Sequence, residues 1–502
     1  ARGSEASLVS LTAYQMKSLW PELKDQEGRS MDQPRSVKKA GASPNNVLSG
    51  GCASMRTMIA MVALEVMALG VSAAVNPSAA NIQRTMKALA ASTARHPAHV
   101  RVLFYGQSIT AQAWTQTVQK RLAERYPTAK CEFRNAAIGG YSAEVLIRTA
   151  DHDLYPWYPD LLFFHVYGSM EKYEEIVKRV RERTSAEIVI WTSHLNSLSP
   201  AQPNEINPEH DARAVKIRDV APKYNCMLID LREKWRAYLK ETGFSITNLL
   251  TDGIHLNGQG CDLYAKFIDE ELLRVPELGD DPAASGTITT VAANASTVTK
   301  GADNRLTLRF TGNRVVAVSD GQGAAGAKAK VLLDGQPMDG LKDVWAITRP
   351  SVGPAGIWMP AINNIAFAKA PVEEDWTLTC LPDSTPDGRE IHFKVEGAVT
   401  GEDGEGWNTE RFVCRSQRVI IEPSDWRVAW TLEYKQATLP EGFKVTWKSY
   451  PLFSRLYEPK PVGTRTLLVQ GCSNQAHTLT LIPEGGELGI GAFVVHAPPK
   501  PQ

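Results

Sequence analysis

One serine in this chain follows a short apolar run, where a hydroxyl group can act as a nucleophile. Ser108 lies in the segment YGQSIT, directly after the apolar residues 102–104, so we expect it at the carboxyl end of a buried strand. A serine in that position faces a crevice, and the N-terminus of the next helix offers N–H groups to a developing oxyanion. By itself, however, a serine at such a turn is more often a helix N-cap than a nucleophile.

A base and an orienting acid occur together in the segment TDGIHLNGQG, residues 251–260. Asp252 and His255 are three residues apart in a predicted loop, a spacing that lets the carboxylate fix the tautomer of the imidazole. His255 would accept the proton of Ser108, and Asp252 would stabilise the imidazolium that results. The alternative is that Asp252 caps a turn and His255 is a surface histidine. The presence of Ser108 favours the catalytic interpretation.

A glycine pair gives a further element of such a site. It lies in NAAIGGYSAE, residues 135–144, directly after the second predicted strand. Glycines let a backbone N–H approach a ligand closely, so Gly140 could supply a second oxyanion donor. The alternative is an ordinary tight turn.

These three segments resemble the SGNH (GDSL-like) hydrolases. The resemblance covers residues 100–270 and depends on the order of Ser108 in GQSIT, Gly140 in NAAIGG, and Asp252 with His255 in DGIHLN. It implies that Ser108 is the nucleophile and that its own N–H and the N–H of Gly140 are two donors of the oxyanion hole. In that family an asparagine side chain is the third donor.

Two positions depart from the family pattern. Gln107 replaces the usual Asp of GDS, which should be tolerated because that position is neither nucleophile nor base. The strand that should end in GxND reads HVYGSMEKYEE, so Met170 replaces the asparagine, and a thioether cannot donate to an oxyanion. Losing one such donor typically costs about 100- to 1000-fold in turnover. The candidates for a replacement, each of which could instead be a packing or surface residue, are His165, Tyr167, Ser169 and His194.

The elements that must position these residues alternate between about residues 80 and 275. Amphipathic stretches at residues 113–126 and 171–184 have apolar residues at spacings of three and four, which predicts helices. Near-continuous apolar runs separate them, which predicts an α/β fold with a doubly wound, flavodoxin-like, five-stranded parallel sheet. The predicted strands are VRVLFYG (100–106), KCEFRNAAI (130–138), DLLFFHVYG (160–168), AEIVIWTS (186–193) and CMLIDL (226–231).

The pattern changes after about residue 283 to short segments with alternating apolar residues. They include RLTLRF (305–310), RVVAVSD (314–320) and WTLEYK (430–435), and they predict an all-β sandwich. We therefore expect a hydrolase domain over residues 75–275, a linker over 276–286 and a β-sandwich over 287–498.

The β-sandwich also bears on the substrate. Its closing segment, HTLTLIPEGGELGIGAFVVHAPP, resembles the last strands of jelly-roll domains found beside bacterial carbohydrate esterases. Seven of the twelve tryptophans fall after residue 283, and exposed ones can stack on sugar rings, although most are expected in the core.

The start of the chain indicates export. Residues 1–54 read as a disordered or mis-annotated leader, and residues 55–74 as a signal peptide with small residues before its end. Glu65 within the apolar stretch favours the alternative of a short amphipathic helix. If the signal peptide operates, the protein is secreted or periplasmic. No further run reaches the length of a membrane span, so we expect none in the mature chain.

Charge and cysteine content exclude several classes of function. Lys plus Arg and Asp plus Glu both number 55, so no global field attracts nucleic acid, and a neutral partner is expected. The chain has seven cysteines and no CxxC pair, which favours buried free thiols and predicts no metal and no cofactor.

Three functions remain open. The first is a carboxylic ester hydrolase that removes acyl groups, with acetyl expected, from a poly- or oligosaccharide by a Ser-His-Asp mechanism. The second is a lipid or aryl esterase of the same fold. The third is a non-catalytic sugar-binding protein with an incomplete oxyanion hole, which the replacement at Met170 favours and the set of Ser108, Asp252 and His255 disfavours.

Overall fold

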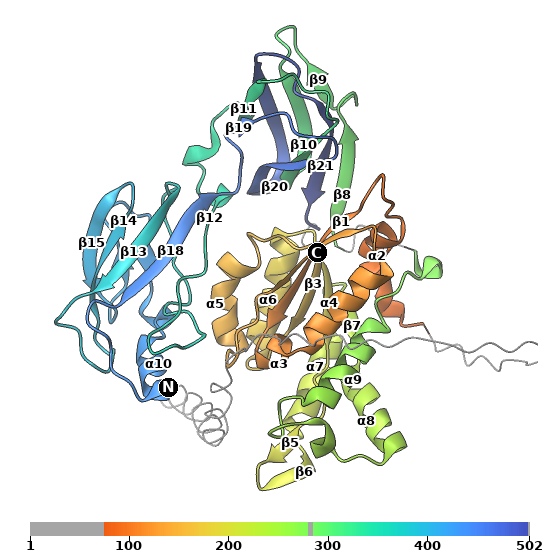
Figure 1. Ribbon diagram of the computed structural model, residues 1–502, viewed down its shortest axis with the longest axis vertical. Coiled ribbons are helices and arrows are strands. Elements are labelled where there is room, and N and C mark those ends of the chain that lie inside the picture. The colour runs from red at the N-terminus through yellow and green to blue at the C-terminus, as the bar shows by residue number, and fades with distance from the viewer. Residues whose placement is uncertain (1–74, 280–284, 500–502) are drawn as a thin grey trace, which may run out of the picture. The chain divides into compact units, whose positions relative to one another are not determined.

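The computed structural model describes residues 75–279 and 285–499 (Figure 1). The predicted leader and signal peptide, residues 1–54 and 55–74, lie outside the described residues, as do residues 280–284 of the predicted linker.

The first half of the described chain builds a five-stranded sheet in which every pairing is parallel. The strand order is β2-β1-β3-β4-β7, which is the flavodoxin-like order that the sequence predicts. Each predicted strand exists, with ends shifted by a few residues. The strands are β1 (His99–Gly106), β2 (Lys130–Asn135), β3 (Leu161–His165), β4 (Glu187–Trp191) and β7 (Met227–Ile229).

Helices cover both faces of this sheet (Figure 1). Along β1, Phe104 belongs to the core on one face and Tyr105 to the core on the other, as expected where successive side chains alternate. α4 and α9 pack on the first face, and α5, α6 and α7 on the second. The helices are α2 (Gln83–Ala90), α3 (Ser108–Ala111), α4 (Trp114–Arg125), α5 (Ala143–Asp153), α6 (Met170–Arg183), α7 (Glu209–Lys223), α8 (Leu231–Thr242) and α9 (Gly258–Asp269).

The C-terminal region is built on antiparallel sheets, which confirms the predicted all-β half. The larger sheet has seven strands. Its long strand β10 replaces the two predicted strands RLTLRF and RVVAVSD, and it continues across a bulge between Gly312 and Arg314. The strands of this sheet are β8 (Thr287–Ala292), β9 (Val298–Lys300), β10 (Leu306–Ser319), β11 (Lys328–Leu333), β19 (Leu456–Tyr457), β20 (Arg465–Glu484) and β21 (Ile490–Ala497).

A second antiparallel sheet is inserted in the chain between β11 and β19. It has its own apolar core around Trp376, Phe393 and Trp447, separate from the core of the larger sheet. Its strands are β12 (Trp345–Ile347), β13 (Glu374–Cys380), β14 (His392–Gly397), β15 (Gly401–Trp407) and β18 (Lys444–Pro451). The C-terminal region therefore has two cores.

One predicted strand of this region is wrong. The segment WTLEYK forms the end of helix α10 (Val428–Lys435). Its buried residues are Val428, Thr431 and Leu432. Thr431 and Leu432 follow Val428 by three and four positions, so all three lie on one face of the helix. The helix ends at Gln436, whose φ of 50° is left-handed.

Buried contacts join the C-terminal region to the α/β domain. Arg349 forms a bidentate pair with Asp153 of α5, whose side chain is fully buried. Tyr141 donates a hydrogen bond to Asn363 Oδ1 at 2.6 Å. Such contacts are costly to break, so the two parts hold one another in place.

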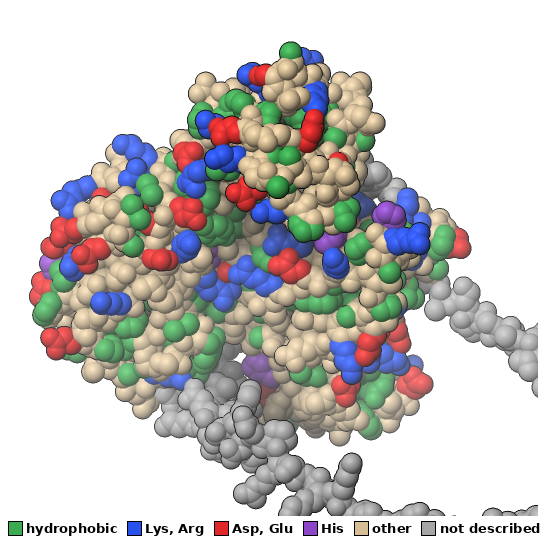
Figure 2. All heavy atoms as spheres, turned by 45° about the horizontal axis from the view of Figure 1, so that its top comes forward, with side chains coloured by type: hydrophobic (Ala, Val, Ile, Leu, Met, Phe, Trp, Pro, Cys, Tyr) green, Lys and Arg blue, Asp and Glu red, His purple; other side chains and the backbone are tan. Residues whose placement is uncertain are grey.

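On the face shown in Figure 2, basic and acidic side chains are interspersed. This fits the balanced charge of the sequence. Within the described ranges, no helix combines the length and apolar character needed to cross a membrane. The six cysteines in these ranges are unpaired, and five of them are buried.

Candidate active site

Ser108 is the first residue of α3, just after the carboxyl end of β1. Gly106, the last residue of β1, pairs with His165 of β3. A Cβ atom at Gly106 would lie 2.3 Å from the carbonyl oxygen of His165 and 2.4 Å from Thr110 Oγ1. Only glycine permits this close approach, which turns the chain sharply and presents Ser108.

The three residues of the predicted triad form a continuous hydrogen-bonded chain. Ser108 Oγ is 2.8 Å from His255 Nε2, and His255 Nδ1 is 2.7 Å from Asp252 Oδ2. This is the contact pattern in which a histidine can take a serine proton while a carboxylate fixes its tautomer. The structure therefore brings together residues that are 147 positions apart in the sequence.

The carboxylate of Asp252 is held in its ionised form. Burial raises its pKa, but the hydrogen bonds and charge of His255 outweigh that effect, and the net pKa is about 2. Its Oδ1 accepts from the backbone N–H groups of Ile254, at 3.0 Å, and His255, at 2.7 Å. Asp252 is therefore a carboxylate that accepts hydrogen bonds throughout the pH range in which most enzymes work.

Hydrogen bonds hold the loop that carries Asp252 and His255 on two sides. Gln112, in the turn between α3 and α4, donates to the Leu256 carbonyl at 2.9 Å and accepts from the Leu256 N–H at 3.1 Å. On the other side, the Ser197 N–H donates to the Gly253 carbonyl at 2.8 Å. Gln112 thus ties the base to the segment that carries the nucleophile.

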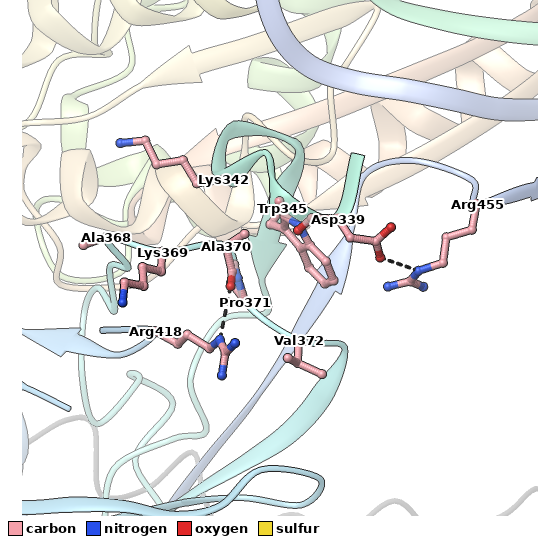
Figure 3. A pocket seen from close by; sticks show the side chains of 11 residues that line it. Asp339, Lys342, Trp345, Ala368, Lys369, Ala370, Pro371, Val372, Arg418 and Arg455 are labelled. Atoms are coloured by element: carbon pink, nitrogen blue, oxygen red, sulfur yellow. Dashed lines mark hydrogen bonds and ion pairs between the residues drawn. The ribbon is translucent and has the colours of Figure 1, made fainter. Parts of the chain in front are cut away.

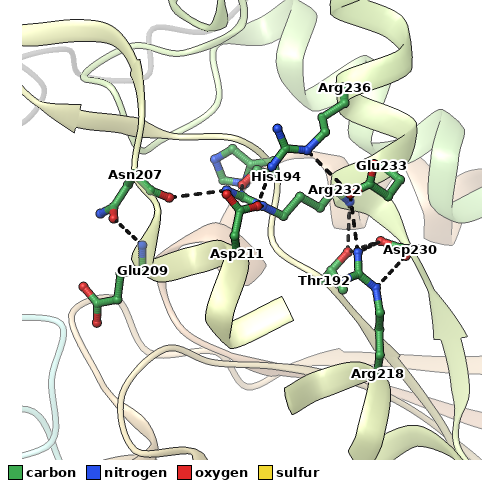
Figure 4. Close-up of polar contacts among 10 residues, drawn as sticks. All are labelled: Thr192, His194, Asn207, Glu209, Asp211, Arg218, Asp230, Arg232, Glu233 and Arg236. Atoms are coloured by element: carbon green, nitrogen blue, oxygen red, sulfur yellow. Dashed lines mark hydrogen bonds and ion pairs between the residues drawn. The ribbon is translucent and has the colours of Figure 1, made fainter. Parts of the chain in front are cut away.

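A buried arginine supports His194, which makes a third contact with this loop (Figure 4). Arg232, fully buried at the start of α8, donates to Asp211 Oδ1 at 2.6 Å and to the His194 carbonyl at 2.8 Å. The His194 ring in turn lies 2.8 Å from the Ile254 carbonyl oxygen through Nε2. No pattern in the sequence indicates Arg232 or Gln112, because their contacts involve distant segments.

Gly139, the first glycine of the segment, lies beside Ser108. A Cβ atom at Gly139 would be 3.7 Å from Ser108 Cβ. Gly140 has a φ of 78°, a left-handed conformation that favours glycine. This backbone can thus approach an acyl group bound at Ser108.

His194 is poorly suited to be the third donor. Burial lowers its pKa to about 3, so the ring is neutral. A carbonyl oxygen can only accept, so the hydrogen on Nε2 is committed to Ile254. The other ring nitrogen then carries no hydrogen.

His165 and Tyr167, the two candidates that follow or end β3, each have a buried polar atom. The His165 ring stacks on Trp191 at 5.5 Å and meets the Tyr167 ring edge-on at 5.2 Å. His165 Nε2 and the Tyr167 hydroxyl are buried, and among the described residues neither has a hydrogen-bond partner. By contrast, the Ser169 hydroxyl caps α6 by accepting from the Lys172 N–H at 3.2 Å.

Gln107 contacts the nucleophile directly. Its Oε1 accepts a hydrogen bond from Ser108 Oγ at 2.9 Å, and its Nε2 is buried without a partner in the described part of the chain. The sequence predicts only that the replacement at this position is tolerated. The structure shows that its amide shares the Ser108 hydroxyl with His255.

A separate cavity of about 650 Å³ lies within the C-terminal region (Figure 3). Trp345 and Arg418 are among its lining residues, and Arg455 pairs there with Asp339 at 2.7 Å. None of the predicted site residues lines it, so it is distinct from the site around Ser108.

The chain is similar in structure to several solved proteins over about a third of its length. A protein described as a GDSL-like lipase from Parabacteroides merdae is 17% identical, with a TM-score of 0.32, and the match covers 35% of this chain and 96% of that one. An acetyl xylan esterase is 21% identical, with a TM-score of 0.30, and the match covers 34% and 98%. An acetylxylan esterase from Geobacillus stearothermophilus is 16% identical, with a TM-score of 0.31, and the match covers 35% and 95%. No family model and no curated protein matches the chain.

Proposed function

We propose that this protein is a serine esterase of the SGNH type that works through an acyl-enzyme. The hydrogen-bonded chain of Ser108, His255 and Asp252 carries this proposal. Its place at the carboxyl edge of a parallel sheet, where α/β folds bind their ligands, supports it further.

In the proposed reaction, Ser108 Oγ attacks the ester carbonyl while His255 takes its proton. The N–H groups of Ser108 and Gly140 stabilise the oxyanion of the tetrahedral intermediate. His255 then donates the proton to the departing alkoxide, which leaves as an alcohol and gives the acyl-enzyme. A water molecule, deprotonated by His255, attacks the acyl-enzyme and releases the acid, and Ser108 regains its proton.

We propose an acetylated poly- or oligosaccharide as the substrate. The resemblance of the sequence to carbohydrate esterases with jelly-roll domains supports this class. The equal numbers of acidic and basic residues also favour a neutral ligand. The second candidate is a non-catalytic sugar-binding protein, which the absence of an asparagine at Met170 favours.

The function is tested with two variants and a substrate panel. We expect wild-type protein to release acetate from acetylated glycans faster than it cleaves long-chain lipid esters or aryl esters. Ser108→Ala and His255→Ala should each lower turnover by about 1000-fold or more, because triad residues act as a unit. Circular dichroism and thermal unfolding should show that both variants fold. Wild-type turnover in folded Ser108→Ala protein would contradict the mechanism. Faster cleavage of the lipid or aryl esters than of the acetylated glycans would favour a lipid or aryl esterase.

We also propose that the protein is exported, on the strength of the apolar segment at residues 55–74. Mature protein recovered outside the cytoplasm should begin near Ala74 or Val75. An intact N-terminus recovered from a cytoplasmic fraction would contradict export.

A further inference from the structure

A tryptophan of the C-terminal region lies against the site around Ser108. Trp358 Nε1 donates to the carbonyl oxygen of Gly139 at 3.0 Å. A Cβ atom at Gly139 would lie 3.3 Å from Trp358 Nε1 and 3.7 Å from Ser108 Cβ. The indole and the proposed nucleophile therefore flank the same glycine, although they are 250 residues apart in the sequence.

Trp358 is exposed, unlike the other tryptophans of the described ranges, which are buried or half-buried. Its side chain is 44% exposed. An exposed indole leaves a large, flat, amphipathic surface open beside the site. That surface is available to a ligand that reaches Ser108.

The backbone on both sides of Trp358 is fixed. Ile357 is 2% exposed and Met359 is fully buried, and both belong to the apolar core on the α5–α6 face of the α/β domain. Because Ile357 and Met359 are packed in this core, the backbone at Trp358 cannot move away from the α/β domain without exposing them. The ring is thus held in position before any ligand binds, which lowers the entropic cost of binding.

Helix α10 supports the ring on one edge. Tyr434 meets Trp358 edge-on, with ring centroids 5.9 Å apart, and Trp430 stacks on Tyr434 at 5.1 Å. Trp430 and Tyr434 are half-buried against the core of the α/β domain. The Lys435 ammonium lies 5.9 Å from the Trp358 ring centroid.

The chemistry of the ring indicates its ligand. The N–H of the indole is already bonded to Gly139, so what the ring can offer is its electron-rich face. A pyranose presents a face of weakly positive C–H groups and is neutral, and it can pack flat on such a ring. A lipid chain would need a continuous apolar groove, whereas Trp358 is a single exposed ring beside polar backbone.

We propose that Trp358 is the platform on which the sugar ring of the substrate stacks while its ester reaches Ser108. The C-terminal region would then complete the substrate site and set its preference for carbohydrate esters. This inference rests on the proposed esterase function, and it adds a specificity-determining residue that lies outside the α/β domain.

The test compares a sugar ester with a small ester that has no ring. Steady-state kinetics would be measured with acetylated xylotriose and with ethyl acetate for wild type, Trp358→Ala and Trp358→Phe. We expect Trp358→Ala to raise KM for acetylated xylotriose by about tenfold, the equivalent of one aromatic stacking contact, and to lower kcat/KM for ethyl acetate much less. Trp358→Phe keeps an aromatic face without the N–H and should recover most of the preference for the sugar ester.

Trp407→Ala is the matched control. Trp407 is a half-buried tryptophan of β15 that stacks on His392 at 4.6 Å. Its replacement should leave the ratio of the two kcat/KM values unchanged. An equal loss in that ratio for Trp407→Ala would overturn the assignment to Trp358.

A second measurement needs no Trp358 variant. In Ser108→Ala protein, acetylated xylotriose should protect Trp358 from oxidation by N-bromosuccinimide, as mapped by mass spectrometry, and ethyl acetate should not. Unchanged oxidation of Trp358 at a saturating concentration of the sugar would overturn the inference.

The outcomes separate the two proposals. If wild-type protein cleaves neither ester, the proposed esterase function fails. If wild type cleaves both esters and Trp358→Ala loses activity on them equally, the esterase function stands and the stacking platform is overturned. In that case Trp358 would only hold Gly139 through its N–H, and Trp358→Phe would fail to rescue.

Discussion

At the scale of single residues, the missing asparagine makes Tyr167 informative. Its hydroxyl is buried and makes no hydrogen bond of good geometry among the described residues, and the neighbouring Ser193 side chain only partly offsets the rise in its pKa caused by burial. A buried hydroxyl without a partner is costly, and contact with an oxyanion would offset that cost. Together with His165, Tyr167 is therefore the leading candidate for the third donor.

We predict that Tyr167→Phe lowers kcat by about tenfold or more and leaves KM nearly unchanged, because the bond would form mainly in the transition state. The variant removes only an oxygen atom, so the packing should persist. Tyr155→Phe is the matched control, since the Tyr155 hydroxyl is also buried without a partner but belongs to the core on the other face of the sheet. Equal kcat values for Tyr167→Phe and wild type would leave His165 as the candidate.

The Asp252 carboxylate gives a prediction about acid stability. Its pKa in the folded protein, about 2, is below the ordinary value of 3.8. A lowered carboxyl pKa contributes stability that is present above about pH 4 and is lost as the pH falls toward about 2. Asp252→Asn cannot titrate, so we expect its free energy of unfolding to fall less than that of wild type over this range. Urea unfolding at a series of pH values measures this, and parallel curves for the two proteins would contradict it.

At the scale of elements, the loop between η3 (Ile246–Leu249) and α9 decides where the base lies. Gly253 has a φ of 84°, and a Cβ atom there would lie 2.8 Å from Ser197 Oγ. The loop can therefore take this path only with glycine at that position, and the path places His255 within reach of Ser108.

We predict that Gly253→Ala lowers kcat/KM by about tenfold or more, because a shift of roughly 1 Å in a catalytic group can cost about 100-fold. It should also lower the melting temperature through left-handed strain. Gly258→Ala is the control: Gly258 begins α9, and a Cβ atom there would meet nothing within 4 Å. That variant should keep full activity, since alanine favours a helix. Equal activity of the two variants would show that the loop tolerates the change.

At the scale of the whole molecule, the α/β domain depends on the C-terminal region for its charge balance. Asp153 of α5 is fully buried, and Arg349 pairs with it through both carboxylate oxygens, at 2.8 and 2.9 Å. Arg349 also donates to the Ala136 carbonyl at 2.8 Å, just before the glycine segment beside Ser108. One arginine thus links the stability of the domain to the neighbourhood of its site.

We predict that Arg349→Ala lowers the free energy of unfolding by about 3 kcal/mol, because it leaves the buried Asp153 carboxylate with only Arg134, at 3.5 Å, as a cationic arginine partner. Arg411→Ala is the control, since its pair with Glu422 is exposed on both sides and should be worth at most about 1 kcal/mol. Adding Asp153→Asn to Arg349→Ala should recover part of the loss. Denaturant unfolding measures all three, and equal effects of the two arginine variants would contradict the buried pair.

The sequence by itself determined the parallel sheet and the residues of the proposed triad. Both depend on local patterns: five apolar runs separated by helices dictate parallel strands, and parallel strands end at one edge. A serine directly after the first run lies at that edge, and His255, in the loop between η3 and α9, reaches it.

Only the tertiary structure decided the rest. The segment WTLEYK alternates like a strand but forms α10, because its buried face includes Val428, which precedes the pattern. The roles of Gln112, Arg232 and Trp358 depend on partners from 21 to 219 residues away, and no spacing in the sequence encodes such contacts. Which tryptophans are buried and which are exposed is likewise decided by packing. The number of tryptophans can therefore be read from the sequence, but the identity of the one beside Ser108 cannot.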